Sequence, residues 1–113
     1  MGSLSAVELV GLPVRLHGAR LGRVLDLVLD PAARRVLGFV VDCGEETPRF
    51  LPFAASQPGE NEVAVASALM LLDDVGFYRE RGVSFSELLE ARHRAAGMLV
   101  GPNGDVVDLE SAA

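Results

Sequence analysis

Few residues of this chain could do chemistry, and they are scattered along the sequence. His17 and His93 are the only histidines, and neither has a second histidine at the spacing that would let a helix or strand share a metal ion. We therefore expect both to be solvated, His17 in a turn and His93 on a helix. Lysine is absent, which excludes Schiff-base chemistry and a lysine general base.

Cys43 is the only cysteine, so an intrachain disulfide and a cysteine-cluster metal site are excluded. A thiol becomes nucleophilic when a base or a positive dipole lowers its pKa. Cys43 instead lies among Asp42, Glu45 and Glu46, and neighbouring negative charge raises a thiol pKa. The sequence thus predicts an inert, partly buried thiol.

Two carboxylates and one glycine-rich stretch complete the candidates for chemistry. Asp26 and Asp30 share one face of a predicted strand, where paired carboxylates can transfer protons or bind a cation. Asp30 precedes Pro31, which favours a role in capping the adjacent turn. Residues 101–105 lack the Lys-Ser/Thr of a phosphate loop and the acidic series of a calcium loop, and a hairpin turn explains them. We therefore assign no catalytic residue, no metal ligand and no cofactor, and expect that the protein is not an enzyme.

The composition indicates the class of protein. With 113 residues, 50% of them hydrophobic, the chain suits one domain, or one small domain with an appendage. A net charge of −6 opposes direct nucleic-acid binding, which depends on basic side chains that neutralise phosphates. The longest nearly apolar run, 64–72, is too short to span a bilayer, and residues 1–11 show no signal-peptide pattern. We expect a soluble cytoplasmic protein that gains buried surface by pairing with a second copy.

Short apolar runs divided by turn residues predict a mainly β domain. Leu25, Leu27 and Leu29 alternate with other side chains at the period of a half-buried strand. Gly38, inside another apolar run, indicates a bulge or a sharp bend. The strands expected from these signals are 13–16, 23–30, 36–43, 48–53 and 62–66, and residues 67–72 are either a sixth strand or the lead into a helix.

The sequence period changes from that of strands to that of helices after residue 72. Asp73 has the position of a helix N-cap, and Gly82 that of the residue following a helix. Ser84 and Glu87 match a capping box at the start of a second helix, which Gly97 would end. Two short helices are therefore expected.

The last part of the chain predicts a β-hairpin over 98–109, with Asn103 and Gly104 in a type I′ turn. We accordingly divide the chain into a barrel domain, 1–72, and a helical segment with a terminal hairpin, 73–113. The hairpin is either a vestigial or swapped barrel element, or it packs on its own barrel or on a neighbouring copy.

The order of the predicted strands and turns resembles the PRC-barrel family over residues 9–66. The residues that carry the resemblance are Gly-Leu-Pro-Val at 11–14, Leu-Gly-Arg-Val at 21–24, Asp26, Asp30, Val-Leu-Gly-Phe-Val-Val at 36–41 and Phe-Leu-Pro-Phe at 50–53. The resemblance implies a small barrel of about six antiparallel strands. It also implies action by docking onto other proteins, and no shared catalytic constellation that could be carried over.

Two sets of residues are candidates for binding a partner. The basic set, predicted to form a patch across neighbouring strands, is Arg34, Arg35 and Arg49. Solvated arginines that discourage strand addition are the alternative. The apolar set, which either packs on its own barrel or forms a subunit interface, is Phe77, Tyr78, Leu88 and Leu89.

These observations favour a non-enzymatic adaptor that binds a protein partner, forms a homodimer, uses no cofactor, makes no direct contact with nucleic acid and does not insert into a membrane. One alternative is a ribosome-assembly or RNA-processing accessory that acts through a protein partner, because the family includes a ribosome-maturation factor. A barrel that binds a small molecule is the second alternative. The sequence leaves open the partner, the pathway and the geometry of the dimer.

Overall fold

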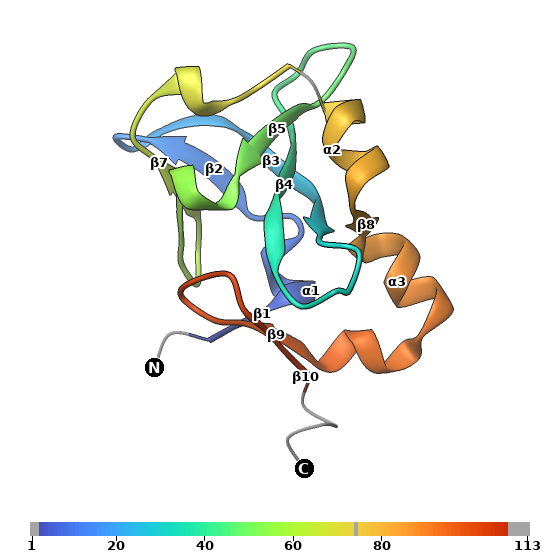
Figure 1. The fold of residues 1–113 in the computed structure, drawn as a ribbon. Coiled ribbons are helices and arrows are strands. Elements are labelled where there is room, and N and C mark those ends of the chain that lie inside the picture. Colours follow the sequence, from blue (N-terminus) through green and yellow to red (C-terminus); the bar gives the residue numbers. More distant parts are fainter. Residues whose placement is uncertain (1–2, 74, 109–113) are drawn as a thin grey trace.

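One curled sheet of seven strands dominates the fold (Figure 1). The computed structural model describes residues 3–73 and 75–108, without the side chains of Phe77, Arg79, His93, Arg94 and Asp108. The hydrogen-bonded order is β5-β4-β3-β2-β7-β6, and β8 pairs with β3. The strands are β2 (Pro13–Leu16), β3 (Ala19–Leu29), β4 (Val36–Asp42), β5 (Arg49–Pro52), β6 (Ser56–Pro58), β7 (Val63–Val65) and β8 (Val83–Ser84).

A second, three-stranded sheet and the helices surround this curled sheet. The small sheet has the order β1-β9-β10, with β1 (Leu4–Ser5), β9 (Met98–Val100) and β10 (Val106–Asp108). The helices are α1 (Ala6–Leu9), α2 (Val75–Arg81) and α3 (Phe85–Ala91), and the 3-10 turns are η1 (Phe53–Ala55), η2 (Ala68–Met70) and η3 (His93–Gly97). In Figure 1, α2 and α3 flank one side of the curled sheet, and the small sheet lies below it. The prediction of a mainly β chain with two helices after the strands is confirmed.

The curled sheet is open, whereas the sequence predicted a closed antiparallel barrel. Its outer strands, β5 and β6, are joined through η1, and within the described residues no ladder links them. One pair, β2 with β7, is parallel. This parallel pair arises because the chain passes from β5, at one edge of the sheet, to β6, at the other edge. The next strand, β7, then pairs with β2 and runs in the same direction. Closure of the barrel is therefore not confirmed.

Two bulges set which side chains of β3 and β4 face the core. Opposite Val40 and Val41 of β4, strand β3 carries one extra residue, Leu25, whose side chain is largely exposed. Past this bulge the phase changes, so Val24 joins Leu27 in the core, and the predicted alternation fails at Leu25. A second irregularity lies beside Gly38, which confirms the bulge predicted there.

The curled sheet buries side chains on both of its faces, which explains the nearly continuous apolar sequence of β4. The inner cluster includes Leu27 and Phe39, and it also receives Phe85 from α3. On the outer face a second cluster forms around Val40 and Phe50, and α2 covers it. Burial on both faces is why this strand shows no polar alternation.

The small sheet pairs β1, near the start of the described chain, with the β9–β10 hairpin near its end. This hairpin also forms hydrogen bonds with residues beside the β3–β4 turn. Leu4 of β1 pairs with Val100 of β9. The backbone N–H of Val36 donates to the carbonyl of Gly104 at 2.8 Å. Val100 also belongs to the inner cluster, so residues before and after position 72 share one core. The division of the chain at residue 72 remains a prediction.

Turn geometry differs from prediction at the terminal hairpin. His17 and Gly18 both have positive φ, 50° and 84°, and form the two-residue type I′ turn between β2 and β3. In the terminal hairpin, Gly104 has positive φ, 87°, whereas Asn103 does not. The N–H of Gly104 donates to the carbonyl of Gly101 at 3.0 Å, so this is a three-residue loop with glycine in the left-handed region. The hairpin itself forms, but its predicted turn type is wrong.

The helix ends also differ from the predicted ones. α3 ends at Ala91, and η3, which ends at Gly97, follows after one extended residue. Gly82 does follow α2, but its φ is not positive. A Cβ on Gly82 would lie 2.3 Å from the carbonyl oxygen of Leu29, so glycine is needed there for close approach to β3. The predicted N-cap, Asp73, instead bonds Arg49, and the position before α2 lies outside the described residues.

Candidate interaction surface

Asp26 is the one charged side chain that the described part of the chain buries, at 7% exposure. Its carboxylate accepts hydrogen bonds from the N–H of Leu27 at 2.8 Å and the N–H of Ser86 at 3.0 Å. It also accepts from the hydroxyls of Ser84 and Ser86, the latter at 2.7 Å. Asp26 thereby supplies from β3 an acceptor for the first turn of α3. The predicted capping box does not form, because the Ser84 oxygen accepts no backbone N–H of α3.

Asp30 caps the β3–β4 turn, as predicted. Its Oδ1 accepts from the N–H of Arg34 at 2.7 Å, and the N–H of Ala33 donates to its carbonyl. The two aspartates of β3 thus work separately, one on a turn and one on a helix. Their oxygens are engaged by backbone and hydroxyl donors.

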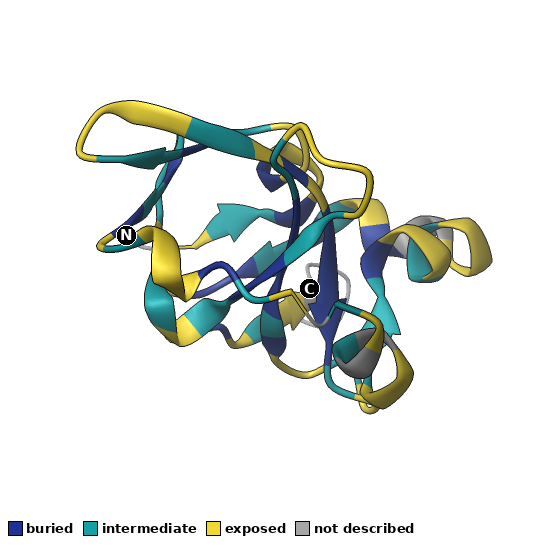
Figure 2. Cartoon of the chain, turned by 90° about the horizontal axis from the view of Figure 1, so that it is seen from above, coloured by how far each residue is buried: buried dark blue, intermediate teal, exposed yellow. Residues whose placement is uncertain are grey.

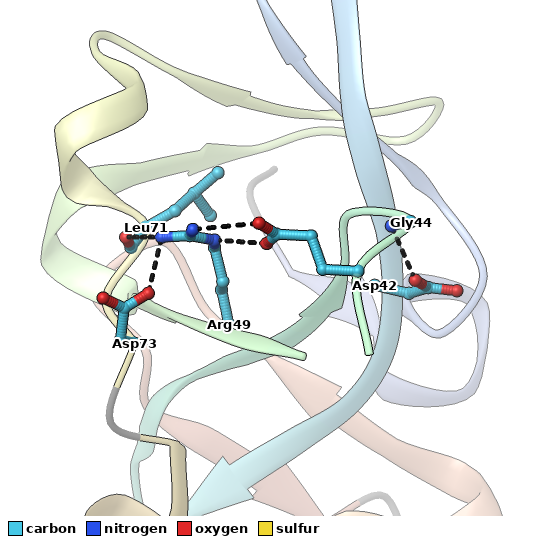
Figure 3. A network of polar contacts seen from close by, with 6 residues as sticks. Asp42, Gly44, Arg49, Leu71 and Asp73 are labelled. Carbon is cyan, nitrogen blue, oxygen red and sulfur yellow. Dashed lines mark hydrogen bonds and ion pairs between the residues drawn. The ribbon is translucent and has the colours of Figure 1, made fainter. Parts of the chain in front are cut away.

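Arg49 lies at the centre of a polar network (Figure 3). Its guanidinium donates to both carboxylate oxygens of Glu45, at 2.7 and 3.2 Å, and lies 2.7 Å from Asp73. A further, longer bond reaches the carbonyl of Leu71. The guanidinium lowers the pKa of Glu45, and the carboxylates raise the pKa of Arg49. Arg49 is therefore engaged in joining the β4–β5 loop to the segment before α2.

The structure does not bring the three candidate arginines into one patch. Arg35 precedes β4 and donates to Asp105 at 2.9 Å, whereas Arg49 pairs in register with Val41, near the other end of β4. Residues 36 and 41 are five positions apart, which is about 17 Å along a strand. Arg34 is exposed next to Arg35. The predicted patch is therefore divided between the two ends of the sheet.

Cys43 is half-buried beside the start of this network. Burial raises the pKa of the thiol most strongly, and Glu45 and Asp42 raise it further, while the Arg49 guanidinium opposes them. The predicted direction of the pKa shift is confirmed, although burial rather than neighbouring charge is the main cause.

The apolar helical candidates pack on their own chain. The ring of Tyr78 stacks on Phe50 with 3.9 Å between ring centroids. Leu88 and Leu89 are partly buried against the inner cluster. The side chain of Phe77 lies outside the described residues, as does that of His93.

Unengaged side chains gather instead at the end of the curled sheet where β2, β4 and β7 finish. The parallel register pairs Leu16 with Val65, so η2 lies at the same end as the β2–β3 turn. At this end Leu69 is 87% exposed and Met70 41%. In Figure 1, η2 and the β4–β5 loop lie at the top of the view and the β2–β3 turn at its upper left. Figure 2 shows that the outer turns are mostly exposed, whereas the central parts of the strands are buried. We call the group Arg20, Arg23, Glu46, Leu69 and Met70 the upper-end surface.

The upper-end surface includes a shallow hollow of about 510 Å³, lined on one side by Arg20 and Arg23 and on the other by Asp42 and Cys43. In the described chain, Arg20, Arg23 and Glu46 make no ion pair and no side-chain hydrogen bond. Sequence reasoning missed Leu69 and Met70 because they lie inside the apolar run 64–72, which resembles a buried strand. Their exposure follows from η2, which breaks that run into a turn.

The described residues were also compared with the requirements of a metal site and of a membrane-spanning helix. Among residues 3–73 and 75–108, no group of three or more His, Cys, Asp or Glu side chains is placed to hold a metal ion. No helix in that part of the chain has the length and apolarity to cross a membrane. His17, at the β2–β3 turn, is exposed as predicted.

Comparison with known families gives one match. The family model described as PRC-barrel domain matches residues 1–69, more than half of the chain. A comparison with curated proteins gave no match. The matched residues include β1 to β7 and the first two residues of η2, and thus contain all of the upper-end surface except Met70.

Proposed function

This chain belongs to the PRC-barrel domain family, and we propose that it is a non-catalytic module that binds other proteins and forms a homodimer. The observation that carries the proposal is the exposure of Leu69, 87%, beside Met70 on a turn at the end of the sheet. Methionine is enriched at protein interfaces. Covering a large exposed apolar side chain with a partner lowers the free energy of the complex.

The engagement of the polar side chains supports a module that acts by contact. The oxygens of Asp26 are occupied by backbone and hydroxyl donors, and Arg49 is held between two carboxylates. The pKa of the Cys43 thiol is raised, which opposes formation of a nucleophilic thiolate at neutral pH. A catalytic role for Asp26 or Arg49 would require that side chain to be released from its present contacts.

Light scattering on the purified protein tests the proposal. At micromolar concentration we expect a mass of about twice the 12.0 kDa of one chain. Leu69→Asp should weaken the dimer by about tenfold or more, because it places a charge on the apolar contact. Leu69 is exposed within its own chain, so this variant should keep the wild-type secondary structure, which circular dichroism measures.

Val7→Asp is the matched control. Val7 is 41% exposed on α1, which packs with the small sheet at the other end of the molecule. It should dimerise as the wild type does. A wild-type protein of single-chain mass up to high micromolar concentration would contradict the proposed homodimer.

A further inference from the structure

We infer that the upper-end surface is a self-complementary dimer interface, in which Arg20 and Arg23 of one copy receive Glu46 of a second copy. The inference rests on the proposed homodimer and adds where the copies meet and which side chains pair. Apolar contact between the two copies of Leu69 and Met70 forms the centre.

The basic side of the upper-end surface is the β2–β3 hairpin. Residues 13–23 contain three arginines and no acidic residue, in a chain whose net charge is −6. Arg15 is engaged by Glu62, with 3.5 Å between Nε and Oε1. Arg20 and Arg23 have no such partner in the described chain, and they line the open hollow. Arg23 pairs in register with Asp42, but within the described residues neither Arg20 nor Arg23 forms an ion pair or a side-chain hydrogen bond. This hairpin therefore offers two guanidinium groups whose hydrogen-bond donors are available to a partner.

The acidic side is the β4–β5 loop. Residues 42–48 contain three acidic residues and no basic residue. Asp42 accepts the N–H of Gly44 at 2.9 Å, and Glu45 is held by Arg49. Glu46 is exposed and, among the described residues, makes neither an ion pair nor a side-chain hydrogen bond. It is therefore the free carboxylate on this side.

The positions of the two sides fit a two-fold axis. In a dimer of this symmetry, residue i of one copy meets residue j of the other, and j meets i. The upper-end surface carries both signs of charge, on the β2–β3 hairpin and on the β4–β5 loop, with η2 in the same region (Figure 1). A half-turn about an axis near η2 would place each glutamate opposite the arginines of the other copy. Opposite charges at an interface fix its register and exclude wrong partners.

The presence of both arginines and Glu46 on the upper-end surface favours a second copy of this chain over other partners. A nucleic acid would meet Glu46 and Asp42 as well as the arginines, and the net charge of −6 opposes phosphate binding further. An acidic protein would satisfy the arginines but leave Glu46 uncompensated. A second copy satisfies both sides with the same contact.

Charge exchange between variants tests the pairing. The double variant Arg20→Glu with Arg23→Glu, and separately Glu46→Arg, should each weaken the homodimer by about tenfold or more, because like charges then face each other twice. An equimolar mixture of the two variants should dimerise with near wild-type affinity, because opposite charges face each other at both contacts. Arg34→Glu, an exposed arginine at the other end of β4, is the control and should not change the affinity. Sedimentation equilibrium gives the dissociation constants of the wild type, the two charge variants, their mixture and the control.

The outcomes separate this inference from the proposed function. Loss of dimer in both variants with recovery in the mixture supports the pairing. A wild-type dimer that neither variant weakens, or a mixture that does not recover, overturns the pairing and leaves the proposed homodimer standing. A monomeric wild type overturns both.

Discussion

At the scale of single residues, backbone strain is concentrated in two turns. In the described chain, His17 and Ala33 are the non-glycine residues with positive φ, and Ala33 has φ of 56°. The left-handed region costs a residue with a Cβ about 1–2 kcal/mol. His17 lies in the β2–β3 turn and Ala33 in the β3–β4 turn. The pairing of the strands that flank each turn offsets the conformational free energy of these two residues.

Ala33→Gly should stabilise the protein. Glycine relieves the strain but adds freedom to the unfolded chain, so the expected net gain in unfolding free energy is about 0.5–1 kcal/mol. Ala32→Gly is the matched control in the same turn, where φ is not positive, and it should lower the unfolding free energy by about 0.4–1 kcal/mol. Urea denaturation measures both. Equal destabilisation by the two variants would contradict the assigned turn geometry.

Patterns of neighbouring residues in the sequence predicted the role of Asp30, but not the partners of Asp26 or the exposure of Leu69. Asp30 precedes proline, and that local pattern was enough to assign it to the turn. The partners of Asp26 are 58 and 60 positions away, so no local pattern could link them to it. The exposure of Leu69 depends on a 3-10 turn that interrupts an apolar run, and side-chain hydropathy alone does not reveal such a turn.

At the scale of elements, α3 is held to β3 by one buried carboxylate. Asp26→Asn keeps the size of the side chain but removes the charge and leaves one acceptor oxygen for several donors. We expect a loss of about 1–3 kcal/mol in unfolding free energy, measured by urea denaturation. Glu60→Gln, which changes an exposed carboxylate without a described partner and outside the proposed interface, should stay within about 0.5 kcal/mol of the wild type. An unchanged urea midpoint for Asp26→Asn would show that β8 and the packing of Phe85 suffice to hold α3.

The elements themselves were largely predictable, whereas their pairing was not. Turn residues and apolar runs placed β2, β4 and β7 within a residue or two of their observed bounds. The parallel pairing of β2 with β7 depends on how the chain crosses from β5 through η1, and strand periodicity carries no information about direction. The bulge at Leu25 shifts the phase of β3, and a two-residue period read across it assigns the wrong face.

At the scale of the whole molecule, the two ends of the curled sheet differ. The lower end is covered by the small sheet and α1, which join the beginning and end of the described chain. The upper end carries the exposed side chains of η2 and, among the described residues, charged side chains of both signs that form no ion pair. Because the small sheet and α1 already cover the lower end, we expect contact with a second copy at the upper end.

Amide hydrogen exchange of the wild-type protein, compared between nanomolar and high micromolar concentration, tests this account most directly. For the proposed dimer, we expect slower exchange at the higher concentration in the β2–β3 turn, the β4–β5 loop and η2, with no change in α1 or the small sheet. Identical exchange in the three upper segments at both concentrations, or protection that appears at α1 and the small sheet instead, would contradict it.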